Sequence, residues 1–135
     1  MIFLDSAAIV KLIRREAESD ALANWLAAQP DKDLTASSLV LTEVPRALRR
    51  SDPGRLSAVP TVLARLNRVP VDDTVLSTAA TYPEPMLRTL DAIHLASAQS
   101  LALEGLTLTA FVTYDKRLLA AAAEIGLPTA APGAN

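Results

Sequence analysis

Short apolar runs alternate with segments of helical spacing along the whole of this 135-residue chain. The apolar runs predict strands at residues 1–4, 34–36, 68–71, 108–114 and 127–130. Between them, apolar residues recur every three or four positions, which predicts amphipathic helices. These helices are expected at residues 6–15, 19–28, 39–48, 55–66, 72–80, 88–103 and 115–125, with Pro60 kinking or dividing the fourth. Such alternation indicates an α/β fold, with a mainly parallel sheet and α-helices on both faces.

The composition favours one soluble domain. Half of the residues (50%) are hydrophobic, which suits a full-sized core in a chain of this length. The chain has no cysteine, which excludes disulfides and fits a reducing cytoplasm. There is no basic segment of a signal peptide, and the longest run without Asp, Glu, Lys or Arg, residues 92–103, is too short for a membrane span. We therefore expect a cytoplasmic protein with one domain over residues 1–130 and a flexible tail over 131–135.

The charge balance narrows the classes of function. A formal net charge of −2 argues against a general nucleic-acid coat protein, but it is compatible with an enzyme that acts on nucleic acid. With only 4 glycines and no glycine-rich phosphate loop, an enzyme with a nucleotide cofactor is disfavoured.

Four acidic residues lie in or beside apolar segments, where an unpaired charge is costly. They are Asp5, Glu43, Asp91 and Asp115. Asp5 and Asp115 directly follow predicted strands, and the carboxyl ends of parallel strands form the edge at which such sheets bind ligands. N-capping of the following helix is the simpler interpretation for both, and it is compatible with metal binding. If the four acids meet, they form an oxygen-rich site for a hard divalent cation.

Asp91 is the hardest of the four to explain as a surface charge. It lies on the predicted helix 88–103, where only Asp91 and His94 ionise after Thr89. A helix this apolar is expected to be buried on most sides, so Asp91 needs a partner unless it only interacts with the helix dipole. His94 follows three residues later, and a hydrogen-bonded structural histidine is favoured there over a metal ligand.

Glu43 has a stronger alternative interpretation. Arg46 and Arg50 follow it by three and seven residues, which is also the pattern of a solvated ion-pair surface. Pro45 lies two residues after Glu43, removes a backbone hydrogen bond and crowds the carbonyl of Leu41. A kinked or shifted turn is therefore expected, and the position of Glu43 relative to the other acids is the hardest to predict.

Four segments carry a family resemblance when taken together and in order. They are FLDSAA at residues 3–8, TEV at 42–44, LDAIHLA at 90–96 and VTYDKRL at 112–118. The chain, from residue 1 to about 130, resembles a PIN-domain ribonuclease of the VapC toxin type. The resemblance implies a single PIN-like domain with a central five-stranded parallel sheet. It also implies a Mg²⁺- or Mn²⁺-dependent endoribonuclease, a small cognate antitoxin and a homodimer.

The resemblance also assigns roles to residues. It implies that Asp5, Glu43, Asp91 and Asp115 are the catalytic acids, supported by the hydroxyl side chains of Ser6 and Thr113. We expect the three aspartates to bind the metal, with Glu43 as a further ligand or a base that positions water. The expected substrates are loops of transfer or ribosomal RNA, because unpaired bases are what proteins read in RNA.

Basic and apolar surface residues complete the hypothesis. The basic side chains expected to contact RNA phosphates are Arg46, Arg50, Arg88 and Lys116. Leu22, Trp25 and Leu26 form an apolar strip that could line a groove for an antitoxin helix or pack in the core.

Two alternative functions remain open. A catalytically silent PIN-fold interaction module would keep the fold only, although the presence of all four acids argues against it. A receiver-like phospho-acceptor domain is less favoured, because it needs a second acid beside the first and here Ser6 follows Asp5.

Overall fold

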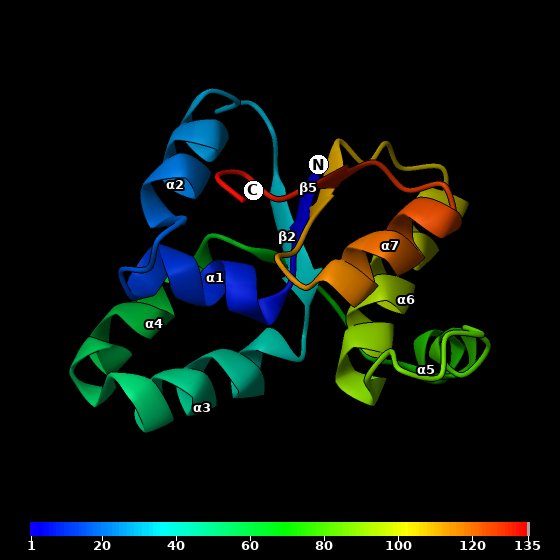
Figure 1. Ribbon diagram of the computed structural model, residues 1–135, viewed down its shortest axis with the longest axis horizontal. Coiled ribbons are helices and arrows are strands. Elements are labelled where there is room, and N and C mark those ends of the chain that lie inside the picture. The colour runs from blue at the N-terminus through cyan, green and yellow to red at the C-terminus, as the bar shows by residue number, and fades with distance from the viewer. Residues whose placement is uncertain (135) are drawn as a thin grey trace.

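The computed structural model describes residues 1–134 and shows an α/β fold around one five-stranded sheet (Figure 1). The strands are β1 (Ile2–Leu4), β2 (Leu34–Ser37), β3 (Asn67–Val69), β4 (Ala110–Val112) and β5 (Thr129–Ala130). Their order is β3-β2-β1-β4-β5, and every neighbouring pair is parallel. The predicted fold class and the location of each strand are confirmed, although β4 is shorter than the apolar run that predicted it.

Helices connect the strands and agree with the predicted segments. They are α1 (Ser6–Ile13), α2 (Ser19–Ala27), α3 (Val40–Ser51), α4 (Val59–Ala64), α5 (Asp73–Ala79), α6 (Thr89–Leu103) and α7 (Lys116–Glu124). The predicted helix over residues 55–66 is divided into a 3₁₀ segment, η1 (Pro53–Ala58), and α4. Helix α4 begins at Val59, which places Pro60 in its first turn, where the missing amide is tolerated.

The sheet separates two helical layers. Figure 1 shows α1 to α4 on one side of the strands and α5 to α7 on the other. Alternate residues of a strand point to opposite faces, and β1 follows this rule. Ile2 and Leu4 pack in the core beneath α1, α3 and α4, whereas Phe3 packs against α6 and α7. All three are fully buried, so the apolar start of the chain fills both cores at once.

Strand β4 repeats the pattern beside β1. Ala110 and Val112 join the first core, and Phe111 joins the second. The rings of Phe3 and Phe111 stack across the two strands with centroids 5.5 Å apart and planes inclined by 11°. Because these are the chain's two phenylalanines and aromatic residues make up only 4% of the chain, almost all other core packing is aliphatic.

The order of the strands reverses between β1 and β4. The chain proceeds outward from β1 to β2 and β3, then returns to place β4 on the other side of β1. The carboxyl ends of β1 and β4 therefore lie side by side, and the amide of Asp5 donates to the carbonyl of Val112 at 3.2 Å. Clefts at such reversals are where open α/β sheets bind ligands.

The C-terminal segment lies against the domain. The Tyr114 hydroxyl donates to the carbonyl of Pro132 at 2.8 Å. Gly133, with φ of +84°, approaches α2 so closely that a Cβ there would lie 2.6 Å from the Cβ of Ala21. Part of the predicted tail, Asn135, lies outside the described residues, and the boundary at residue 130 stays a prediction. Within residues 1–134, no helix is long and apolar enough to cross a membrane.

Candidate active site

Asp5 lies at the junction of β1 and α1 and has two roles in the structure. Its Oδ1 accepts a hydrogen bond from the amide of Ala8 at 2.9 Å, which caps α1. The side chain is almost completely buried, and burial raises the pKa of its carboxyl. The Thr113 hydroxyl and the Ala8 amide lower that pKa in part, while the charge of Asp91 raises it further. A buried carboxylate with a raised pKa beside another acid is typical of a functional site.

Asp115 occupies the equivalent place after β4. Its Oδ1 accepts from the amide of Leu118 at 2.9 Å and so caps α7. The hydroxyl of Thr113, which is fully buried, accepts from the amide of Asp115 at 3.2 Å. Both aspartates are therefore N-caps, as the simpler interpretation proposed. Since both stand at the carboxyl ends of adjacent strands, capping also fixes their carboxylates at the reversal of the sheet.

Asp91 lies in the first turn of α6, and the expected burial of this helix is confirmed from Ala92 to Ala98. Burial raises the pKa of the Asp91 carboxyl, the nearby Arg88 lowers it, and the charge of Asp115 raises it. The Arg88 guanidinium joins the two acids, with Nε 3.3 Å from Asp91 Oδ2 and Nη2 3.7 Å from Asp115 Oδ2. Asp91 and Asp115 are thus joined through Arg88.

Glu43 reaches the same region from α3, and α3 continues through Pro45. Its Oε1 accepts from the Ser6 hydroxyl at 2.8 Å and lies 2.6 Å from His94 Nε2. Burial would raise the pKa of this carboxyl, but the hydrogen bonds and charge of His94 and the bond from Ser6 lower it overall. Glu43 is therefore held as a carboxylate despite being only 27% exposed.

The four acids are linked through their neighbours, but they do not form a finished metal cage. The charge of Asp91 raises the pKa of the Asp5 carboxyl, and the charge of Asp115 raises that of the Asp91 carboxyl. The imidazole of His94 lowers the pKa of Asp5, Glu43 and Asp91. Within residues 1–134, no group of three or more His, Cys, Asp or Glu side chains is arranged to hold a metal ion. The available donors are carboxylate oxygens, which suit Mg²⁺ or Mn²⁺. Mg²⁺ commonly uses one or two protein carboxylates and keeps several waters, so the donors fit such an ion.

Sequence reasoning predicted the four acids as the site, but it did not predict the contacts that His94 and Arg88 make with them. His94 is buried and hydrogen-bonded, as predicted, but its partner Glu43 lies 51 residues away on another helix, so no local spacing could reveal the pair. The bridge from Arg88 to Asp91 has a local signal, because the two residues are three apart around the start of α6. The bridge from Arg88 to Asp115 depends on the tertiary fold.

The basic residues predicted to contact RNA differ in their surroundings. Arg46 and Arg50 are exposed on α3, and Lys116 is exposed at the start of α7. None of these three forms an ion pair with another residue of the described chain. Glu43 is therefore not part of an ion-pair surface with Arg46 and Arg50, which was its alternative interpretation. Arg88 differs because it already contacts two acids.

Comparison with known proteins identifies the family of this chain. The profile of the PIN domain family matches residues 2–124. The chain belongs to the PIN-domain family. It is 53% identical to "Ribonuclease VapC35" of Mycobacterium tuberculosis over 133 residues, which is 98% of each chain. The predicted resemblance to PIN domains of the VapC type is confirmed.

Solved structures share the fold. The crystal structure of Mycobacterium tuberculosis VapC20, described as a sarcin-ricin loop cleaving toxin, superposes with a TM-score of 0.71 at 16% identity, covering 94% of this chain and 96% of that one. VapBC2 from Rickettsia felis, bound to a DNA fragment from its promoter, gives a TM-score of 0.71 at 17% identity, covering 98% and 99%. At such identities the superposition establishes the PIN fold.

Proposed function

We propose that this PIN domain is an endoribonuclease toxin that depends on Mg²⁺ or Mn²⁺. The observation that carries the proposal is the placement of Asp5 and Asp115 at the carboxyl ends of adjacent strands where the sheet reverses, with Arg88 contacting both Asp91 and Asp115. Ser6, which follows Asp5, also holds Glu43. The near full-length similarity to a VapC ribonuclease supports the same reaction class.

The residues of the site would have different roles in RNA cleavage. Asp5, Asp91 and Asp115 would hold the divalent ion, and Glu43, with Oε1 already bonded twice, would orient the attacking water. The ion, when bound, lowers the pKa of water and stabilises charge on the phosphate. Thr113 and Ser6 would help to position the acids. The Thr113 hydroxyl accepts a hydrogen bond from the amide of Asp115, and the Ser6 hydroxyl donates one to Glu43.

Exposed cations around the acids would anchor the RNA. Arg46 and Arg50 on α3 and Lys116 on α7 are free of ion pairs among the described residues and would contact phosphates. Arg88 would exchange a carboxylate for a phosphate oxygen, since its side chain is 76% exposed. The substrates we propose are loops of transfer or ribosomal RNA in the cytoplasm, and the similarity in fold to a toxin that cleaves the sarcin-ricin loop supports the ribosomal choice.

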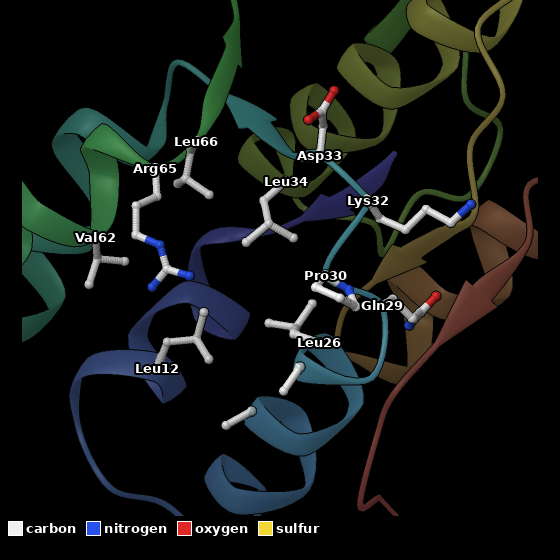
Figure 2. Close-up of a pocket in the computed structure, with 12 residues that line it drawn as sticks. Leu12, Leu26, Gln29, Pro30, Lys32, Asp33, Leu34, Val62, Arg65 and Leu66 are labelled. Atoms are coloured by element: carbon white, nitrogen blue, oxygen red, sulfur yellow. The ribbon is translucent and has the colours of Figure 1, made fainter.

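A groove supports an antitoxin as the partner. A cavity of about 590 Å³ lies between α1, α2, α4 and the segment before β2. Figure 2 shows the side chains of Leu12, Leu26 and Val62 around it. Its mostly aliphatic lining suits the apolar face of a helix. Of the predicted apolar strip, Leu22 is a core residue and Leu26 lines the groove. The fold shared with VapBC2 favours an antitoxin as the occupant of this groove.

Neighbouring alanines provide a matched test of the groove. Ala27 lines it, whereas Ala28 does not, and both are exposed at the end of α2. We expect Ala27→Glu to weaken antitoxin binding by more than about tenfold, because a charge would enter an apolar contact. Ala28→Glu should change affinity less than about threefold, a difference of less than about 0.7 kcal/mol. Equal effects of both substitutions on affinity, measured by titration calorimetry, would remove the groove from the proposal. Light scattering of the purified chain tests the proposed homodimer.

Purified total RNA tests the nuclease itself. The antitoxin-free chain is expected to produce discrete fragments with Mg²⁺ or Mn²⁺ and none with EDTA. The variants Asp5→Asn and Asp91→Asn should produce no fragments above background, and circular dichroism would check that both are folded. Mapped fragment ends would identify the RNA. Absence of cleavage by the folded wild-type chain across many RNAs would favour the silent PIN-fold interaction module instead.

A further inference from the structure

We infer that His94 is a positioning residue for the catalytic step, acting by holding the Glu43 carboxylate in place; this inference depends on the proposed nuclease function. His94 is 2% exposed, and its Nε2 lies 2.6 Å from Glu43 Oε1. Because a carboxylate at this distance can only accept, Nε2 carries the proton and donates it. Hydrogen bonds to an ionised acceptor are short and about twice as strong as neutral ones.

The contact joins the two helical layers across the edge of the sheet. Glu43 is on α3, Ser6 begins α1, and His94 is on α6, which lies on the opposite side of the strands (Figure 1). Ser6 Oγ is 2.8 Å from Glu43 Oε1 and 3.3 Å from His94 Nε2, so the three side chains form one compact cluster. A carboxylate fixed from two elements has less rotational freedom than one on an exposed helix surface.

The two bonds share a single oxygen of Glu43. Both Ser6 and His94 contact Oε1, and within residues 1–134 no hydrogen bond involves Oε2. Oε2 is thereby left to bind a water. The imidazole of His94 also lowers the pKa of the Asp5 and Asp91 carboxyls, so it acts on three of the four acids. Pro45 weakens the hydrogen bonding of α3 directly beyond Glu43, which makes an anchor outside that helix more valuable.

A purely structural histidine would give different results in a double-mutant cycle. His94→Leu should lower kcat for RNA cleavage by more than about tenfold while KM changes less than about threefold, because phosphate contacts are untouched. His94→Gln, whose amide can donate to Oε1, should recover most of kcat. In a Glu43→Gln background, His94→Leu should add little further loss, since both changes remove one interaction.

The single histidine of this chain permits a readout that does not depend on activity. In metal-free wild-type protein, NMR should show one downfield, slowly exchanging imidazole Nε2–H proton. Glu43→Gln should move this resonance upfield, whereas Glu124→Gln, an exposed change at the end of α7, should leave it in place. If His94→Leu fails to fold, Ser6→Ala provides a second variant, expected to lower kcat by a smaller factor through the same oxygen.

The outcomes separate the inference from the proposed function. Additive losses of kcat in the cycle, or an imidazole resonance that does not move in Glu43→Gln, would overturn the positioning role of His94. The proposed nuclease function would still stand if the wild-type chain cleaves RNA. Failure of the wild-type chain to cleave any RNA would overturn the nuclease and, with it, the role of His94 in cleavage. The NMR result would then still show whether the His94–Glu43 contact exists.

Discussion

At the scale of single residues, two carboxylates of the candidate site, those of Asp5 and Asp91, cost stability when they are charged in the absence of a cation. Asp5 illustrates this, because burial raises the pKa of its carboxyl above the usual 3.8. The folded chain therefore keeps a proton that the unfolded chain loses, and its stability falls as pH rises through the window from 3.8 to the raised pKa. Above that window, the full cost of the buried charge is present.

Asp5→Asn should remove this cost and keep the cap, because asparagine caps helices as well as aspartate does. In EDTA, the free energy of unfolding of the variant should match that of wild type near pH 3.8 and exceed it at neutral pH. Urea denaturation at a series of pH values measures the difference. A variant that is less stable than wild type at neutral pH would contradict this account of Asp5.

At the scale of elements, a substitution in α3 tests whether the position of Glu43 depends on its hydrogen bonds to Ser6 and His94 or on the geometry of the helix. Pro45 cannot donate to the carbonyl of Leu41, so Pro45→Ala should restore that hydrogen bond. We expect about 1–2 kcal/mol of added stability, the helix gain being reduced by the greater freedom of alanine in the unfolded chain. Thermal melts measure this gain. RNA cleavage should change less than about threefold, a change in activation free energy below about 0.7 kcal/mol, because Ser6 and His94 hold Glu43.

The same elements show what the sequence could predict. The apolar run that predicts β1 and the apolar helix predicted at α6 depend on local burial, and both predictions are confirmed. The assignment of the four acids to the site stays a prediction, and it was made because an isolated carboxylate in an apolar run needs a partner. The contact of Glu43 with His94 was not predictable, because it depends on how α3 and α6 meet across the sheet.

At the scale of the whole molecule, a chain with net charge −2 must bind RNA through a local concentration of cations. Replacing Arg46 and Arg50 with glutamate should weaken RNA binding and reduce the slope of log K against log salt by about 1.4, if each arginine contacts one phosphate. Lys32 and Arg65 provide the control, because they lie just before β2 and β3, at the opposite edge of the sheet from the acids. Glutamate at these two positions should leave the salt slope unchanged. Equal changes of the slope in both pairs would contradict RNA binding through a local cluster of cations.

The most direct test of the central claim is the rate of cleavage of one RNA as a function of Mn²⁺ concentration. Wild type would be compared with Asp5→Asn, Glu43→Gln, Asp91→Asn and Asp115→Asn in antitoxin-free preparations. We predict saturable dependence on Mn²⁺ for wild type and a loss of more than about 100-fold, or about 2.7 kcal/mol, in each variant. Cleavage that persists in EDTA, or that survives at the wild-type rate in the folded aspartate variants, would contradict a metal-dependent site built from these acids.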